Sequence, residues 1–112
     1  FRSETKIERD KMYSETIETY ERLIEKEETP EDQKAIITEE ISRITNMKNG
    51  IIISENLIKN KGIEEVVILE NNGVVNVIVK TVQLNEDKVS QIQNIILKEL
   101  KVDIGNLSIS RK

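Results

Sequence analysis

The feature that most constrains the fold is a tight-turn sequence, Asn71-Asn72-Gly73, placed between two runs of β-branched residues. Asparagine and glycine tolerate the positive backbone φ that a two-residue hairpin loop needs. The flanking runs, residues 63–70 and 74–82, are rich in Ile and Val, which favour strands. The pattern therefore predicts a β-hairpin. Both strands carry apolar residues on both faces, so either both faces are buried or one face is reserved for a partner.

A helix and a third strand follow the hairpin. Asn85 is a good helix N-cap, and Leu84 and Val89 have the spacing of a hydrophobic staple around it. The apolar face of the predicted helix contains Val89, Ile92, Ile96 and Leu100. Beyond Val102 the pattern changes to alternation, with Leu107 and Ile109 opposed by serines, which predicts a strand. A strand-helix-strand crossover of this kind places helices on one face of a three-stranded sheet.

Two charged helices are predicted before the hairpin. In residues 3–28 apolar residues recur at helical spacing, but the stripe is thin before Tyr13, so we expect the first turns to project from the domain. Thr29 is predicted to cap a second helix with Pro30 in its first position. We expect this helix to continue through Gly50 and to end near Gly62, although residues 51–53 are β-branched.

The predicted fold class is therefore α+β: two N-terminal helices followed by a strand-strand-helix-strand unit, with a three-stranded sheet and helices packed on one face. We expect residues 1–28 to form a projecting helix and residues 29–112 to form a single compact unit. A chain of 112 residues is long enough for one modest core.

The composition argues against an enzyme. The chain has no His and no Cys, which removes the commonest general base, thiolate nucleophiles and most transition-metal ligands. Adjacent acids such as Glu39 and Glu40 point to different sides of a helix and form no carboxylate dyad. The four glycines are isolated, so no phosphate-binding loop is present. We expect no catalytic residue, no cofactor and no metal site.

A nucleic-acid-binding domain is the alternative reading of the element order, which is similar to that of a KH domain. Such a domain needs a G-x-x-G loop, and none occurs here. The net charge is −4, and the basic cluster of Lys48, Lys59 and Lys61 is diluted by neighbouring acids. Both observations count against nucleic acid.

Protein partners are the better candidates. Tyr13 and Tyr20 share a helical face, which indicates packing on the domain or, alternatively, a partner surface, because Tyr is enriched at interfaces. An exposed sheet edge is a second candidate, since neither residues 74–82 nor 107–110 contain a Pro that would block strand addition.

The residues also resemble a known family. The segments concerned are Glu8 to Tyr13, Glu55 to Gly62, Asn76 to Lys80 and the helix from Ile92 to Lys101. In this order they are similar to the soluble domain of the stage III sporulation protein AH family of endospore-forming bacteria. The resemblance spans nearly the whole chain, and no single motif in it is diagnostic.

This resemblance implies a non-enzymatic module of a sporulation channel. Family members have a ring-building fold similar to that of secretion-system ring proteins of the YscJ/FliF type, and they form homo-oligomeric rings. They bind stage II sporulation protein Q as a heterodimer, together with other channel proteins, and support engulfment and forespore gene expression. In some members the partner resembles a zinc peptidase. The resemblance also implies an N-terminal transmembrane helix that anchors the protein in the mother cell membrane, with this domain in the intermembrane space. Because the chain begins with Phe1 and not Met, we expect such a segment upstream.

No short family signature identifies the contact residues. We expect the heterodimer to use a sheet edge and one helix flank. The candidate residues are Val75, Val77, Val79, Leu107 and Ile109, followed by Tyr13 and Tyr20. An adaptor unrelated to sporulation would share every one of these features, and failure to bind protein Q would reveal it.

Overall fold

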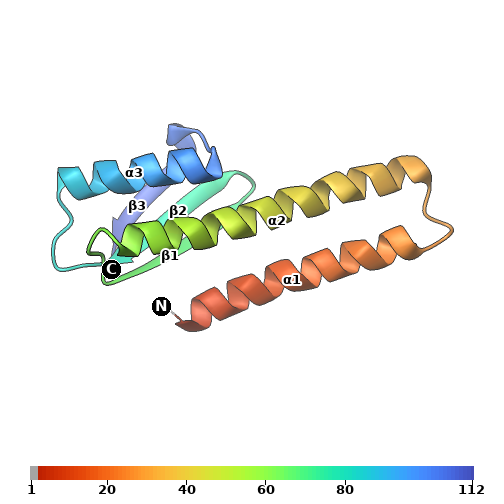
Figure 1. Cartoon of the computed structure of the whole chain (residues 1–112), viewed down its shortest axis with the longest axis horizontal. Coiled ribbons are helices and arrows are strands. Elements are labelled where there is room, and N and C mark those ends of the chain that lie inside the picture. The colour runs from red at the N-terminus through yellow and green to blue at the C-terminus, as the bar shows by residue number, and fades with distance from the viewer. Residues whose placement is uncertain (1–2) are drawn as a thin grey trace.

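The computed structural model describes residues 3–112 (Figure 1). Phe1, on which the expectation of an upstream segment rests, lies outside the described residues, as does Arg2. The elements are α1 (Ser3–Glu25), α2 (Glu31–Lys59), β1 (Glu65–Asn71), β2 (Val74–Lys80), α3 (Glu86–Leu100), the short 3₁₀ helix η1 (Ile104–Asn106) and β3 (Leu107–Arg111). This order confirms the predicted α+β class. Within residues 3–112, no helix combines the length and the apolar character needed to cross a membrane.

The sheet has the order β1-β2-β3, with β2 in the middle. β1 pairs with β2 in antiparallel orientation, and β3 pairs with β2 in parallel orientation. The hairpin turn is as predicted: Asn71 pairs with Val74, and Asn72 and Gly73 have φ values of 52° and 84°. Positive φ at both loop residues is typical of a type I′ turn, whose twist matches that of the strands.

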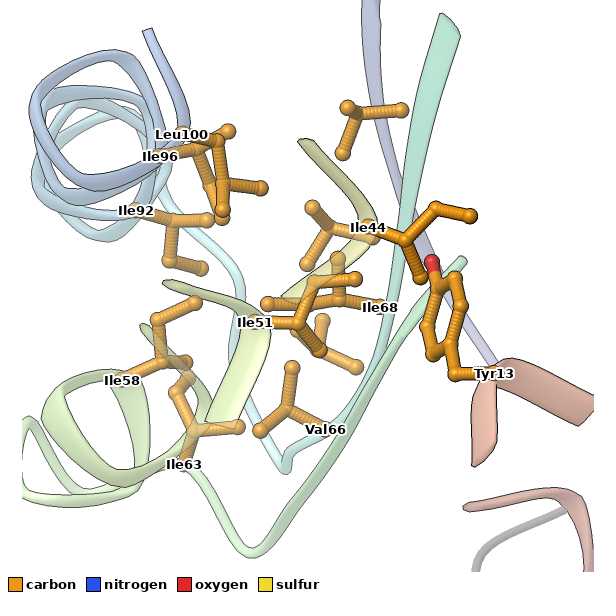
Figure 2. Close-up of a cluster of buried hydrophobic side chains, with 13 residues drawn as sticks. Tyr13, Ile44, Ile51, Ile58, Ile63, Val66, Ile68, Ile92, Ile96 and Leu100 are labelled. Atoms are coloured by element: carbon orange, nitrogen blue, oxygen red, sulfur yellow. The ribbon is translucent and has the colours of Figure 1, made fainter. Parts of the chain in front are cut away.

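One face of the sheet packs against α2 and α3 and forms the core (Figures 1 and 2). The core is aliphatic apart from Tyr13, as expected for a chain with three aromatic residues. Its fully buried helical residues are Ile51, Ile58, Ile92 and Ile96, and its fully buried strand residues are Val66, Ile68, Val75, Val77 and Val79; Val67, outside this cluster, is also fully buried. Each such side chain contributes about 1.5 to 3 kcal/mol through burial.

α2 runs without interruption through Gly50, as predicted. Gly50 is buried where α2 crosses the end of α3. A Cβ atom at this position would lie 2.7 Å from Cδ2 of Leu100 and 3.2 Å from the carbonyl oxygen of Glu99. The glycine that weakens the helix locally is therefore what permits the two helices to approach each other closely.

We expect Gly50→Val to lower the free energy of unfolding by about 1 to 3 kcal/mol, because the added carbons overpack the contact between α2 and α3. Denaturant unfolding followed by circular dichroism measures this. Asn49→Val is the matched control: Asn49 is exposed on the same turn of α2, and its replacement should change stability by no more than about 0.5 kcal/mol. Equal losses of unfolding free energy at both positions would show that the contact with α3 does not cause the destabilisation.

The expectation that the first turns of α1 project is wrong. The N-terminal end of α1 lies beside β1, and it is the opposite end, where α1 turns into α2, that extends away from the sheet (Figure 1). This helical arm makes the molecule 55 Å long but 27 and 18 Å across. The radius of gyration is accordingly 16.2 Å, against about 13 Å for a compact domain of this length.

In the loop between α1 and α2, the prediction that Thr29 caps α2 is wrong. Pro30, in extended conformation, is the N-cap of α2, and its carbonyl accepts from the amide of Lys34. The hydroxyl of Thr29 instead donates to the carbonyl of Leu23, 2.8 Å away, at the C-terminal end of α1. Thr29 thus satisfies the end of the first helix and not the start of the second. At α3, by contrast, the predicted cap is confirmed, because Oδ1 of Asn85 accepts from the amide of Lys88.

Candidate functional site

The two edges of the sheet differ in what covers them. β2 is paired on both sides, so only β1 and β3 have an outer edge. The amide of Lys112 donates to the carbonyl of Val79, which fixes the alternation along β3. Backbone groups of Ser108 and Ser110 therefore face β2, while those of Ile109 and Arg111 face outward. We call the outward-facing backbone of residues 107–111 the β3 edge.

The β3 edge is available for hydrogen bonding at Ile109 and Arg111, because the groups of Ser110 between them face β2. The amide of Leu107 is taken by the carbonyl of Ile104 in η1. Within residues 3–112, no side chain is hydrogen-bonded to the backbone of Ile109, and β3 contains no Pro. A row of unpaired amides and carbonyls of this kind is what an added strand uses.

The β1 edge, the outward-facing backbone of residues 66–70, is closed by a buried ion pair. Arg9 of α1 and Glu55 of α2 form two hydrogen bonds, Nη1 to Oε2 at 2.7 Å and Nη2 to Oε1 at 3.2 Å. Nη1 of Arg9 also donates to the carbonyl of Ile68 at 2.9 Å, and the amide of Ile68 donates to Oε2 of Glu55 at 3.0 Å. Both outward backbone groups of Ile68 are thus satisfied by side chains, as a fourth strand would satisfy them.

The Arg9–Glu55 ion pair is buried. Arg9 and Glu55 are each only 5% exposed. Burial alone lowers the pKa of Arg9, but the hydrogen bonds and charge of Glu55, and then of Asp10, outweigh it and raise the pKa above its ordinary value. The guanidinium therefore stays charged, and its fork geometry matches the carboxylate. The pair ties α1, α2 and β1 together at one point.

A second ion pair fixes α1 to the start of β1. Nζ of Lys6 donates to Oε1 of Glu65 at 3.0 Å, and both side chains are about three-quarters buried. The hydrogen bond from Lys6 is the main cause that lowers the pKa of Glu65, helped by the amide of Val66 and the charge of Lys59 and opposed by burial. Lys6 and Arg9 thus contact β1 from adjacent turns of α1.

We expect Glu65→Gln to flatten the acid dependence of stability. The pKa of Glu65 in the folded chain lies below its ordinary value of 4.5, so the stabilisation by its charge is present above that value and is lost as the pH falls through the folded pKa. The variant should lose less than about 1 kcal/mol at neutral pH and less still in acid. Unfolding measured from neutral to acid pH tests this, with the more exposed Glu64→Gln as control. Parallel profiles for the two variants would contradict it.

The predicted partner residues of the second strand lie in the core. Val75, Val77 and Val79 are fully buried against the helices, and β2 has no free edge. Strand addition at residues 74–82, which the sequence left open, is therefore ruled out by the sheet order. Contact of these three side chains with a partner stays a prediction, and it would require the helices to move.

The other predicted partner residues are closer to the surface. Leu107 and Ile109 are half-buried and turn their side chains toward the core, but their backbone lies on the β3 edge. Tyr13 is buried beside Ile44 and Ile68 (Figure 2), and Tyr20 is half-buried. Burial and the charge of Glu70 raise the pKa of Tyr13. For these tyrosines, packing of α1 on the domain accounts for the shared helical face.

Sequence reasoning missed Arg9 and Glu55, although a signal was present. Glu55 lies between Ile51 and Ile58 on the buried side of α2, and Arg9 lies one turn before Tyr13. A single charge on an apolar stripe indicates a buried charge with a partner. Two such charges of opposite sign on neighbouring helices could have been paired from the sequence.

A shallow cavity of about 470 Å³ is lined by no set of residues typical of a catalytic or metal site. It lies between α2 and the end of α3, and its lining residues are Arg43, Asn46, Met47, Glu99, Leu100 and Lys101. Arg43 is already paired with Glu40, Nη2 to Oε1 at 2.7 Å. Within the described residues, no group of acids, His or Cys is placed to hold a metal ion.

The structure is thus an α+β module in which β3, at one edge of the sheet, has outward-facing backbone groups. The family model for SpoIIIAH-like proteins matches residues 1–109. The chain therefore belongs to the SpoIIIAH-like family, which confirms the resemblance found in the sequence.

Comparison with solved structures agrees. A chain from the structure of the SpoIIQ-SpoIIIAH pore-forming complex superposes with a TM-score of 0.83 at 16% sequence identity, covering 95% of this chain and 91% of that chain. At this identity the likeness concerns the fold. Comparison with curated proteins gives no match.

Proposed function

We propose that this chain is a non-enzymatic binding module of a sporulation complex and that it binds SpoIIQ, stage II sporulation protein Q, by strand addition at the β3 edge. The observation that carries the proposal is the asymmetry of the sheet. One edge is closed by Arg9 and Glu55, and the other is open over Ile109 and Arg111. Membership of the SpoIIIAH-like family supports the choice of partner.

An added strand at β3 would be held mainly by backbone hydrogen bonds. Each contributes about 0.5 to 1.5 kcal/mol net, so a few of them give a useful part of the binding energy without any specific side chain. Side chains near the edge supply selectivity. Arg111 lies at the end of β3 and donates to the carbonyl of Thr81, and Ile104 of η1 is 59% exposed beside the start of the strand.

We propose the same cellular setting as for the family: a transmembrane segment upstream of residue 1 in the mother cell membrane, with this domain in the space facing the forespore. Ring assembly with further copies would then use a surface other than the β3 edge, because one edge cannot pair with two neighbours at once. In this setting the module supports engulfment and forespore gene expression by joining two membranes.

The test is titration of the chain with the soluble domain of SpoIIQ from the same organism, followed by calorimetry and by sedimentation. We expect a 1:1 complex. Single-stranded RNA in low salt is the second arm, and we expect no binding, because the net charge is −4 and phosphate contacts need basic residues. No complex with SpoIIQ would refute the proposal, and salt-sensitive RNA binding would favour the nucleic-acid reading.

A further inference from the structure

We propose that Arg9 and Glu55 form a latch that holds α1 over the β1 edge and thereby keeps this edge closed to β1 of a second copy of the chain. The inference concerns the side of the sheet opposite to the proposed SpoIIQ site and does not depend on that site. It rests on the four hydrogen bonds that join Arg9, Glu55 and the backbone of Ile68.

Without α1 over it, the β1 edge would pair with another strand more readily than the β3 edge. It is seven residues long, against five for β3. Its middle part is the apolar run Val66 to Leu69, and it contains no Pro. Long, apolar, unbroken edge strands pair readily with other chains, and covering them with a helix is one way in which proteins prevent this.

The attachment of α1 to this edge is mainly polar. Among residues 4–13, Arg9 and Tyr13 are the buried side chains, whereas Ile7 is 65% and Met12 is 60% exposed. The first three turns of α1 therefore bury little apolar surface. Arg9 is their buried polar contact with β1, with the Lys6 ion pair before it in the chain and the packed Tyr13 after it. Loss of the ion pair should release these turns and uncover the backbone of Ile68.

A second copy fits the uncovered edge. In an antiparallel pair centred on Ile68, the two Ile68 residues would exchange the hydrogen bonds that Arg9 and Glu55 now make. Glu65 would then lie opposite Asn71 of the other copy, and Glu70 opposite Val66, so no two like charges oppose each other. Pairing of this kind is two-fold symmetric and closes after two copies.

The test uses the double variant Arg9→Met, Glu55→Met in the full chain. It removes the hydrogen-bonding groups but leaves apolar side chains of similar length and no unpaired buried charge. We expect the Ile68 amide to exchange at least about tenfold faster than in the wild type at low concentration. We expect sedimentation between about 10 μM and 1 mM to show added dimerisation, with Ile68 protected again in the dimer. The control is Lys11→Met, Glu15→Met, which places the same residues at an exposed pair on α1.

Two results would overturn the inference. One is a folded double variant whose Ile68 amide exchanges as in the wild type. The other is faster exchange with no more association than the wild type or the control shows. If the double variant fails to unfold cooperatively, Arg9→Lys takes its place. This change keeps the positive charge but removes the planar guanidinium that forms two hydrogen bonds with Glu55. That variant should show the same two changes to a smaller extent, and wild-type behaviour in both measurements would overturn the inference.

Discussion

Replacing Arg9 with Ala is expected to lower the free energy of unfolding by about 3 to 5 kcal/mol, the cost of leaving a buried charge without its partner. Glu55 is 5% exposed, so its carboxylate would keep only the amide of Ile68 as partner, and the carbonyl of Ile68 would lose its donor. A domain of this size has a total stability of about 5 to 15 kcal/mol, so the loss is a large fraction of it. Urea unfolding followed by far-ultraviolet circular dichroism measures it.

The matched control is Arg22→Ala on the same helix. Arg22 lies 4.0 Å from Glu18, and both side chains are about two-thirds exposed, so this change should cost less than about 1 kcal/mol. Similar losses for the two variants would mean that the Arg9 pair stabilises no more than a surface pair does. The account of the closed β1 edge would then be wrong.

The second large effect concerns binding. A chain whose Ile109 backbone nitrogen carries a methyl group should bind SpoIIQ at least about 100-fold more weakly. The methyl group removes one outward donor and blocks the approach of a neighbouring strand, as Pro does in edge strands. Loss of about three backbone hydrogen bonds at about 1 kcal/mol each accounts for a change of this size. Calorimetric titration of the semisynthetic chain measures it.

The position of the methyl group provides the control. The amide of Ile109 faces outward, so its methylation should leave the stability of the free chain nearly unchanged. The amide of Ser110 faces β2, and methylation there should destabilise the fold by disrupting the pairing of β2 and β3. Undiminished affinity after methylation of Ile109 would exclude strand addition at this edge.

Local signals in the sequence were sufficient for much of the fold. Asn72 and Gly73 tolerate the positive φ of a tight turn and lie between two strands rich in Val and Ile, and Asn85 is a cap because its side chain can reach the amide of Lys88. Continuity of α2 through Gly50 followed from the apolar period that resumes after it. In each case the residues that interact are within a few positions of each other.

The parts that were wrong depend on contacts that the local sequence pattern does not determine. Thr29 had two helix ends within reach, and spacing alone could not show that its hydroxyl would bind Leu23 and not the start of α2. The first turns of α1 have few apolar residues, so packing was not predicted for them; what holds them is a charge pair across 46 positions, Arg9 with Glu55. Apolar periodicity alone does not identify such a pair, whose signal is one charge of each sign at a position of an apolar stripe.

The sequence predicted that the site is a sheet edge but not which edge it is. An open sheet edge was expected, but the sequence does not determine which strand is central, and Val75, Val77 and Val79 proved to be interior. Strand order depends on the crossover through α3, which places β3 beside β2 and leaves β1 to be covered by α1. Backbone availability at Ile109 follows from that order and not from any residue type.

The most direct measurement is amide hydrogen exchange in the free chain and in the presence of saturating SpoIIQ domain. If SpoIIQ adds a strand at the β3 edge, the amides of Ile109 and Arg111 should exchange at least about 100-fold more slowly in the complex, while that of Ile68 stays as it was. A complex in which Ile109 and Arg111 exchange as fast as in the free chain would contradict the account.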